Sequence, residues 1–134
     1  FARYAYRHVY EAFSKRMVLL IAEGDVDGNV GALHRIGLAE GLRNGESGIQ
    51  YLNQVLEPTL QALEQRLAKH IARGDMIEAD TRHAALLLLS PVVLGLLHQH
   101  DLGGTRCRPL DLTTVIEAQV DVFVRAYEPR RAFN

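Results

Sequence analysis

The chain has 134 residues, of which 48% are hydrophobic and 23% charged, and this composition describes one soluble globular domain with enough apolar material for a core. Its formal net charge is −1 and no basic run stands out, which excludes the electrostatic footprint of an autonomous nucleic-acid binder. The lone Cys107 excludes an intrachain disulfide and fits a reducing compartment, so we expect a cytoplasmic protein.

Residues 1–23 carry apolar side chains at three- and four-residue spacing, which predicts one face of a helix. The pattern is already under way at Phe1, without an initiator Met and without a signal-peptide pattern. We therefore expect another segment to precede this helix. A turn cluster beginning at Gly24 ends it.

A second helix is predicted over residues 30–42, with Leu33, Ile36 and Leu42 facing inward. Its three glycines each cost about 1 kcal/mol relative to alanine in a helix interior. They either allow another backbone to approach closely or let the segment rearrange, and close packing is the favoured interpretation. The glycines are Gly31, Gly37 and Gly41.

The next break is residues 44–48, after which an apolar segment leads into Pro58. Pro58 can occupy the first turn of a helix or kink a longer one. From Thr59 onward the pattern is helical, and Arg73 followed by Gly74 predicts its end. The inward stripe of this helix is Leu60, Leu63, Leu67 and Ile71.

The run from His83 to Leu97 is apolar nearly all the way round, with Asp80 or Thr81 as its N-cap and a kink expected at Pro91. It could be a membrane span, a core helix, or a helix shared between the core and a subunit interface. A span needs about 20 apolar residues. This run is shorter, is interrupted at residues 90–91 and is closed by polar residues 98–101, so we expect no membrane.

A polar loop over residues 102–109 leads to the last helix, which begins at Asp111 or Thr113 and has a wide apolar stripe. No strand pattern appears, so we predict an all-α bundle of about six helices in a single domain of residues 1–134. One chain cannot cover both of its last two long helices, which predicts a homodimer. The expected interface residues are Leu89, Val93, Leu96, Leu97, Leu112, Ile116, Val120, Phe123 and Tyr127.

The order of elements and several motifs resemble the C-terminal effector-binding and dimerisation domain of TetR-type bacterial transcriptional repressors. The motifs are residues 55–63 around Pro58, residues 71–80 around Gly74, Ala84 with Ala85 at the start of the apolar helix, and the closing residues 120–123. The resemblance implies that residues 1–23 link a preceding helix-turn-helix to this domain. It also implies that the last two long helices pair with their copies in a four-helix dimer interface, and that DNA is contacted only through the preceding domain.

In this family a small molecule typically occupies a cavity between the linking helix and the middle helices and changes the spacing of the two DNA-reading heads. The resemblance thus implies a small apolar or amphipathic effector here. Side chains that combine apolar bulk with polar groups suit such a site, and plain core packing is the alternative for each. The candidate ligand-binding residues are His8, Phe13, Met17, His34, Tyr51, Val55 and Leu88.

Metal binding and catalysis have weaker support in the sequence. His98, His100, Asp101 and Cys107 are competent metal ligands, but their spacing matches no standard site, and a solvated helix end explains them. The chain has no phosphate loop, nucleophile elbow or paired His-x-x-x-His site, so we expect neither an enzyme nor a cofactor. The alternatives are a helical carrier or enzyme with a buried apolar cavity, and a pure dimerisation module.

Overall fold

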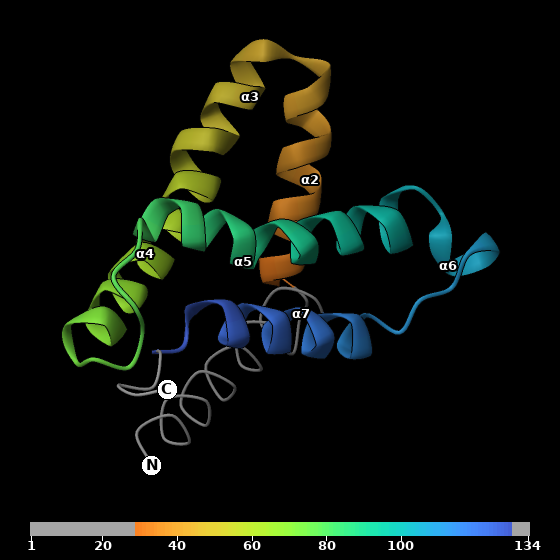
Figure 1. The fold of residues 1–134 in the computed structure, drawn as a ribbon. Helices are drawn as coiled ribbons and strands as arrows, with labels where there is room; N and C mark the ends of the chain where they lie inside the picture. The colour runs from red at the N-terminus through yellow and green to blue at the C-terminus, as the bar shows by residue number, and fades with distance from the viewer. Residues whose placement is uncertain (1–28, 130–134) are drawn as a thin grey trace.

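The computed structural model describes residues 29–129, and its account of side chains begins at His34. Helices joined by short connections make up this part of the chain, and it contains no strand, which confirms the all-α class (Figure 1). The helix expected over residues 1–23 lies outside the described residues. The elements are α2 (Asn29–Arg43), α3 (Gly45–Tyr51), the π-helical turn η1 (Leu52–Leu56), α4 (Glu57–Ala72), α5 (Thr81–Leu96), the π-helical turn η2 (Leu97–Asp101), α6 (Gly104–Cys107) and α7 (Leu112–Tyr127).

Helices α2 and α3 stand side by side as a hairpin (Figure 1). Asn44 separates them, because its Oδ1 accepts a hydrogen bond of 2.9 Å from the backbone N–H of Glu46 and caps α3. The predicted break at residues 44–48 is therefore only a single capping residue, and the chain is helical again from Gly45.

The inward face predicted for α2 is wrong. Ile36 and Leu42 are 65% and 78% exposed, and the side chain of Leu33 lies outside the described residues. His34, Gly37 and Gly41 form the face that meets α3 instead. Apolar periodicity failed here because the contact face is built from small residues, which carry no hydrophobic signal.

Helix α4 continues directly from α3 through η1, so Pro58 lies in the first turn of α4 and also inside a longer helical stretch. The backbone N–H of Glu57 bonds to the carbonyl of Leu52, five residues back, which makes this turn wider than an α-turn. A proline ring normally collides with the carbonyl four residues earlier. The wide turn before Pro58 provides room for the ring without ending the helix.

The predicted end of α4 and start of α5 are confirmed. Gly74 has a φ of +79°, in the left-handed region that favours glycine, and its N–H donates to the carbonyl of Ile71. Together these features end α4. Asp80 is the N-cap of α5 and accepts hydrogen bonds from the N–H groups of Arg82 and His83, at 2.9 and 3.0 Å.

Helix α5 is longer than the sequence suggested. It passes through Pro91 and continues into η2, so that Thr81–Asp101 forms 21 helical residues, within which lies a strongly apolar stretch of 18. By length and composition alone, this helix could cross a membrane. A soluble protein's core helix passes the same test, and Leu88, Val92 and Leu96 of this helix are buried against α4 and α7.

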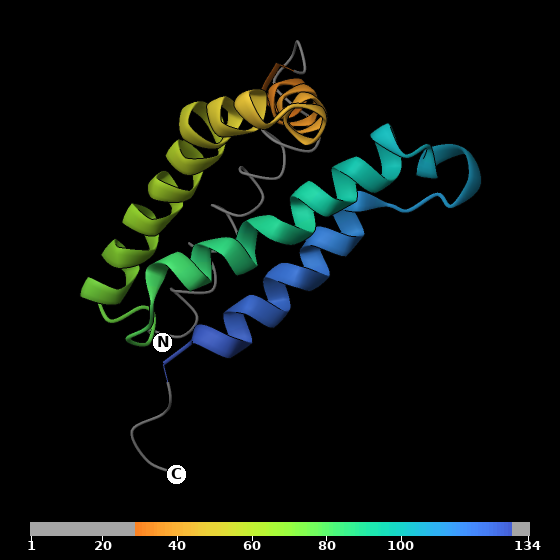
Figure 2. The same cartoon turned by 90° about the horizontal axis from the view of Figure 1, so that it is seen from above.

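The core lies among α4, α5 and α7, and α5 and α7 run side by side in opposite directions (Figure 2). The predicted stripe of α4 is confirmed for Leu60, Leu63 and Leu67, which are buried, while Ile71 is partly buried. The other core residues are Met76, Ala84, Ala85, Leu88, Leu89, Val92, Leu96, Ile116, Val120, Phe123 and Val124.

The segment between α5 and α7 was predicted as a polar loop but contains the short helix α6. The side chain of Gln99 holds its far end: Nε2 donates to the carbonyl of Arg108 at 2.9 Å, and Oε1 accepts from the N–H of Leu110 at 3.0 Å. Asp111 then caps α7, as predicted, through the N–H groups of Thr113 and Thr114. These bonds set where α7 starts beside α5.

Candidate functional site

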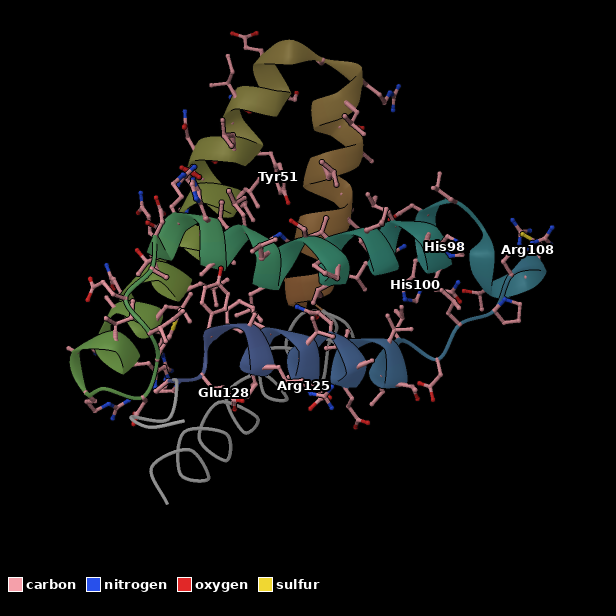
Figure 3. The ribbon with its side chains drawn as sticks, in the orientation of Figure 1. Tyr51, His98, His100, Arg108, Arg125 and Glu128 are labelled. Carbon is pink, nitrogen blue, oxygen red and sulfur yellow. The ribbon has the colours of Figure 1, made fainter. Side chains whose placement is uncertain are left out.

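The hairpin of α2 and α3 buries two of the predicted ligand-binding residues against each other. His34 of α2 is 4% exposed and Tyr51, the last residue of α3, is 7% exposed. His34 Nδ1 lies 3.0 Å from the Tyr51 hydroxyl, and the rings meet edge to face with centroids 6.1 Å apart. Figure 3 shows Tyr51 between α3 and α2. Each polar group therefore satisfies the other inside the protein.

Both members of this pair are neutral at neutral pH. Burial lowers the pKa of the His34 imidazole and raises the pKa of the Tyr51 hydroxyl, because the charged form of each would lose its hydration. Burial is the cause in both cases, and no charged side chain of the described region adds to either shift. The pair is therefore an uncharged, hydrogen-bonded polar contact inside the hairpin.

Glycines bring the two helices close enough for this contact. A methyl group on Gly37 would lie 2.4 Å from Cδ1 of Tyr51, so only glycine leaves room for the ring. One turn further along, a methyl group on Gly41 would lie 3.1 Å from the Cα of Gly48. The structure thus confirms close packing as the role of Gly37 and Gly41.

The remaining predicted ligand residues are not all near this pair. Val55 is partly buried in η1, one turn beyond Tyr51. Leu88 is wholly buried in the core among α4, α5 and α7, where its side chain serves packing. His8, Phe13 and Met17 lie outside the described residues.

The predicted interface residues fall into two groups. Val93, Leu97, Leu112 and Tyr127 are partly buried and retain some surface. The other five are buried inside the protomer's own core: Leu89, Leu96, Ile116, Val120 and Phe123. Their placement at a subunit interface stays a prediction, because helices that are apolar on both faces give periodicity no means of telling which face the protomer uses.

The apolar side chains that α5 and α7 leave exposed are different ones. Leu94 is 65% and Val122 66% exposed. Leu87 lies seven residues before Leu94, and Val115 seven residues before Val122, so each pair recurs on one helix face. Leu86 is exposed as well.

Two of the four metal-competent residues, His98 and His100, lie at the end of the α5–η2 helix (Figure 3). His98 Nδ1 lies 2.7 Å from Gln99 Nε2, His100 is exposed, and Cys107 is exposed with its Sγ 3.5 Å from the carbonyl of Gly103. Within residues 29–129, no three His, Cys, Asp or Glu side chains come together in a way that could hold a metal ion.

Asp101 instead has a partner that the sequence did not reveal. Arg35 of α2 contacts both of its carboxylate oxygens, with Nε 3.2 Å from Oδ2 and Nη2 3.3 Å from Oδ1. The two residues are 66 positions apart, and no local pattern connects them. This ion pair joins the hairpin to the end of the α5–η2 helix.

One of three comparisons with known proteins identifies a family for this chain. Residues 11–129 match the family model described as the AefR-like transcriptional repressor, C-terminal domain, which is a TetR-type C-terminal domain. No match was found among curated proteins or among solved structures. Since the match spans nearly the whole chain and the described part is all-α, this chain belongs to the AefR-like family of transcriptional repressor C-terminal domains.

Proposed function

We propose that the chain is the effector-binding and dimerisation domain of a TetR-type regulator, and that a small molecule binds beside the His34–Tyr51 pair. The buried, hydrogen-bonded pair in a chain of this family is the observation on which the proposal depends. Binding would alter the spacing of DNA-reading heads, and it can do so only by its differential affinity for the two arrangements. This role is regulatory and not enzymatic.

The chemistry of the pair suggests the effector's character. In this proposal Tyr51 donates and His34 Nδ1 accepts, since a phenol hydroxyl is more acidic than an imidazole N–H. The imidazole proton is then on Nε2, where it can donate to an oxygen of the ligand. A neutral, mainly apolar molecule with a carbonyl or hydroxyl oxygen fits, because a buried ionic group without a counter-charge is costly.

Dimerisation would use the outer face of α5 and α7. Leu87, Leu94, Val115 and Val122 are exposed on these two adjacent helices, and a second copy presenting the same face would cover them. An obligate interface of this kind exceeds about 2,000 Å² in total. The partner is therefore a second copy of this chain.

DNA would be contacted only through a domain preceding this one, in the cytoplasm. The net charge of −1 gives the chain little attraction for phosphates, so we expect no sequence-dependent retardation of duplex DNA by these 134 residues alone. Tight, specific retardation would contradict this division of roles.

A thermal screen with neutral apolar compounds tests effector binding. At a hundred times its dissociation constant, a ligand should stabilise the fold by about 2.7 kcal/mol. His34→Ala should reduce that stabilisation and leave the dimer intact, whereas His83→Ala, which changes an exposed histidine on α5, should not. Equal binding by both variants would place the effector elsewhere.

A further inference from the structure

The Arg35–Asp101 ion pair is placed where it can connect the proposed effector site to the α5–η2 helix. Asp101 is the last residue of η2, and a carboxylate at a helix C-terminus is repelled by the unpaired carbonyl groups there. Both of its oxygens are held by the guanidinium of Arg35, the geometry that gives an arginine–carboxylate pair directional strength. The side chains are 34% and 26% exposed, so the pair is partly shielded from solvent.

Arg35 immediately follows His34, and successive helical residues point about 100° apart around the axis. One turn of α2 therefore makes two contacts: His34 with Tyr51 of α3, and Arg35 with Asp101 of η2. A rotation or shift of α2 at His34 moves Arg35 with it, because both side chains extend from adjacent backbone positions.

From Asp101 the connection continues into the segment before α7. The hydroxyl of Thr105 in α6 donates to the carbonyl of Gln99 in η2. The Gln99 side chain holds the backbone of Arg108 and Leu110, just before the Asp111 cap of α7. The end of α5 and the start of α7 thus form one hydrogen-bonded unit, and Arg35 is bonded to it at Asp101.

We propose that the Arg35–Asp101 pair transmits occupancy of the His34–Tyr51 site to the end of α5, the helix that carries the proposed dimer face. Arg35 and Asp101 are positioning residues in this scheme and do not touch the effector. The inference rests on the proposed function for its purpose, but the mechanical link between the two sites can be tested without any effector.

The test is to displace α2 by adding a methyl group at its contact with α3, and to measure the response in the segment that follows η2. Gly37→Ala introduces a methyl group 2.4 Å from the Tyr51 ring, so α2 or the ring must move. Gly45→Ala is the matched control in the same hairpin, because its methyl group has no neighbour within 4 Å. A nitroxide on Cys107, the only cysteine and an exposed one, reports on the segment after η2.

Both variants are made in the full chain with Asp101 and again with Asp101→Asn, which removes the charge at constant size. We expect Gly37→Ala to change the rotational correlation time of the label at least two-fold with Asp101 present, and to have no effect with Asp101→Asn. Gly45→Ala should have no effect in either background. Equal responses in the two backgrounds, or no response with Asp101, would overturn the proposal.

A second perturbation covers the case in which Gly37→Ala does not fold. Tyr51→Phe removes the hydrogen bond to His34 and adds no bulk. Amide exchange at residues 97–103 should then accelerate at least two-fold with Asp101 and be unchanged in the Asp101→Asn background; the same acceleration in both would contradict the link. Failure here leaves effector binding and dimerisation intact, because those are measured separately by the thermal screen and by light scattering.

Discussion

Gln119 of α7 donates a hydrogen bond of 2.7 Å from Nε2 to the backbone carbonyl of Leu88 in α5. This bond links the two antiparallel helices near the middle of α5. The Oε1 of the same amide is buried and has no hydrogen-bond partner, and within residues 29–129 it is the one buried side-chain atom in that situation. A polar atom left this way costs roughly 1–3 kcal/mol of stability.

Gln119→Met should therefore leave the free energy of unfolding unchanged or raise it by up to about 1 kcal/mol, since the lost bond contributes only about 0.5–1.5 kcal/mol. Gln99→Met is the matched comparison, because both ends of that amide are bonded, and it should lower the free energy by about 2 kcal/mol. Urea denaturation measures both. A larger loss for Gln119→Met than for Gln99→Met would contradict this account.

The dimer face can be tested at a position that the protomer does not use. Val122→Asp places a charge on the exposed face of α7, and we expect the dimer dissociation constant to rise at least about 100-fold, or about 2.7 kcal/mol. Light scattering across a dilution series should show the 15.0 kDa chain as the main species.

Leu42→Asp is the control for this experiment, because Leu42 is a comparably exposed apolar residue on α2. The control should remain a dimer. Dissociation by Leu42→Asp and not by Val122→Asp would assign the interface to the hairpin and contradict the assignment to α5 and α7.

Stability should fall in mild acid. Burial lowers the pKa of His34, and burial is also the largest cause lowering the pKa of His70, which the carboxylate of Asp75 partly opposes. The unfolded chain, in which histidine titrates near about 6.5, then binds protons more readily than the folded one. The stabilising effect is present above that pH and is lost as the pH falls toward the lower folded values.

Histidine titrates in the range of about pH 5 to 7.5. Chemical denaturation across this range measures how the free energy of unfolding changes with pH. His34→Asn should flatten it, and His100→Asn, at an exposed position, should not. A slope that is equal in His34→Asn and the parent would show that His34 does not remain neutral inside the protein.

Gly37→Ala should destabilise the fold even though alanine is the better helix former. Overpacking costs about 1–3 kcal/mol, against a gain of about 1 kcal/mol in helix propensity. We expect the free energy of unfolding, measured by thermal or urea unfolding, to fall by about 1 kcal/mol. Gly45→Ala should be neutral or stabilising, and a destabilisation as large as that of Gly37→Ala would mean that the contact with Tyr51 is not the cause.

The sequence by itself determined where several helices begin and end. Asp80, Asp111 and Gly74 act on backbone groups within a few residues of themselves, so their signals are local and readable. The same holds for the one-sided apolar stripe of α4, from Leu60 to Leu67, which matches its buried face. These local motifs, in their order, were also enough to show the family resemblance.

Only the tertiary structure decided which apolar face of α5 and α7 the protomer uses, because an all-apolar surface has no periodic contrast. Leu89 lies in the core whereas Leu87 is exposed, although the two are alike in the sequence pattern. On α2 the face that contacts α3 includes Gly37 and Gly41, which carry no apolar signal. The prediction therefore placed Ile36 inside, although its side chain is exposed.

The candidate site shows the same division. His34 and Tyr51 were both candidates by residue type, but their hydrogen bond depends on how closely the two helices approach at Gly37. The ion pair of Arg35 with Asp101 joins residues 66 positions apart. Such contacts depend on how helices pack in three dimensions, and no spacing rule along the chain contains that information.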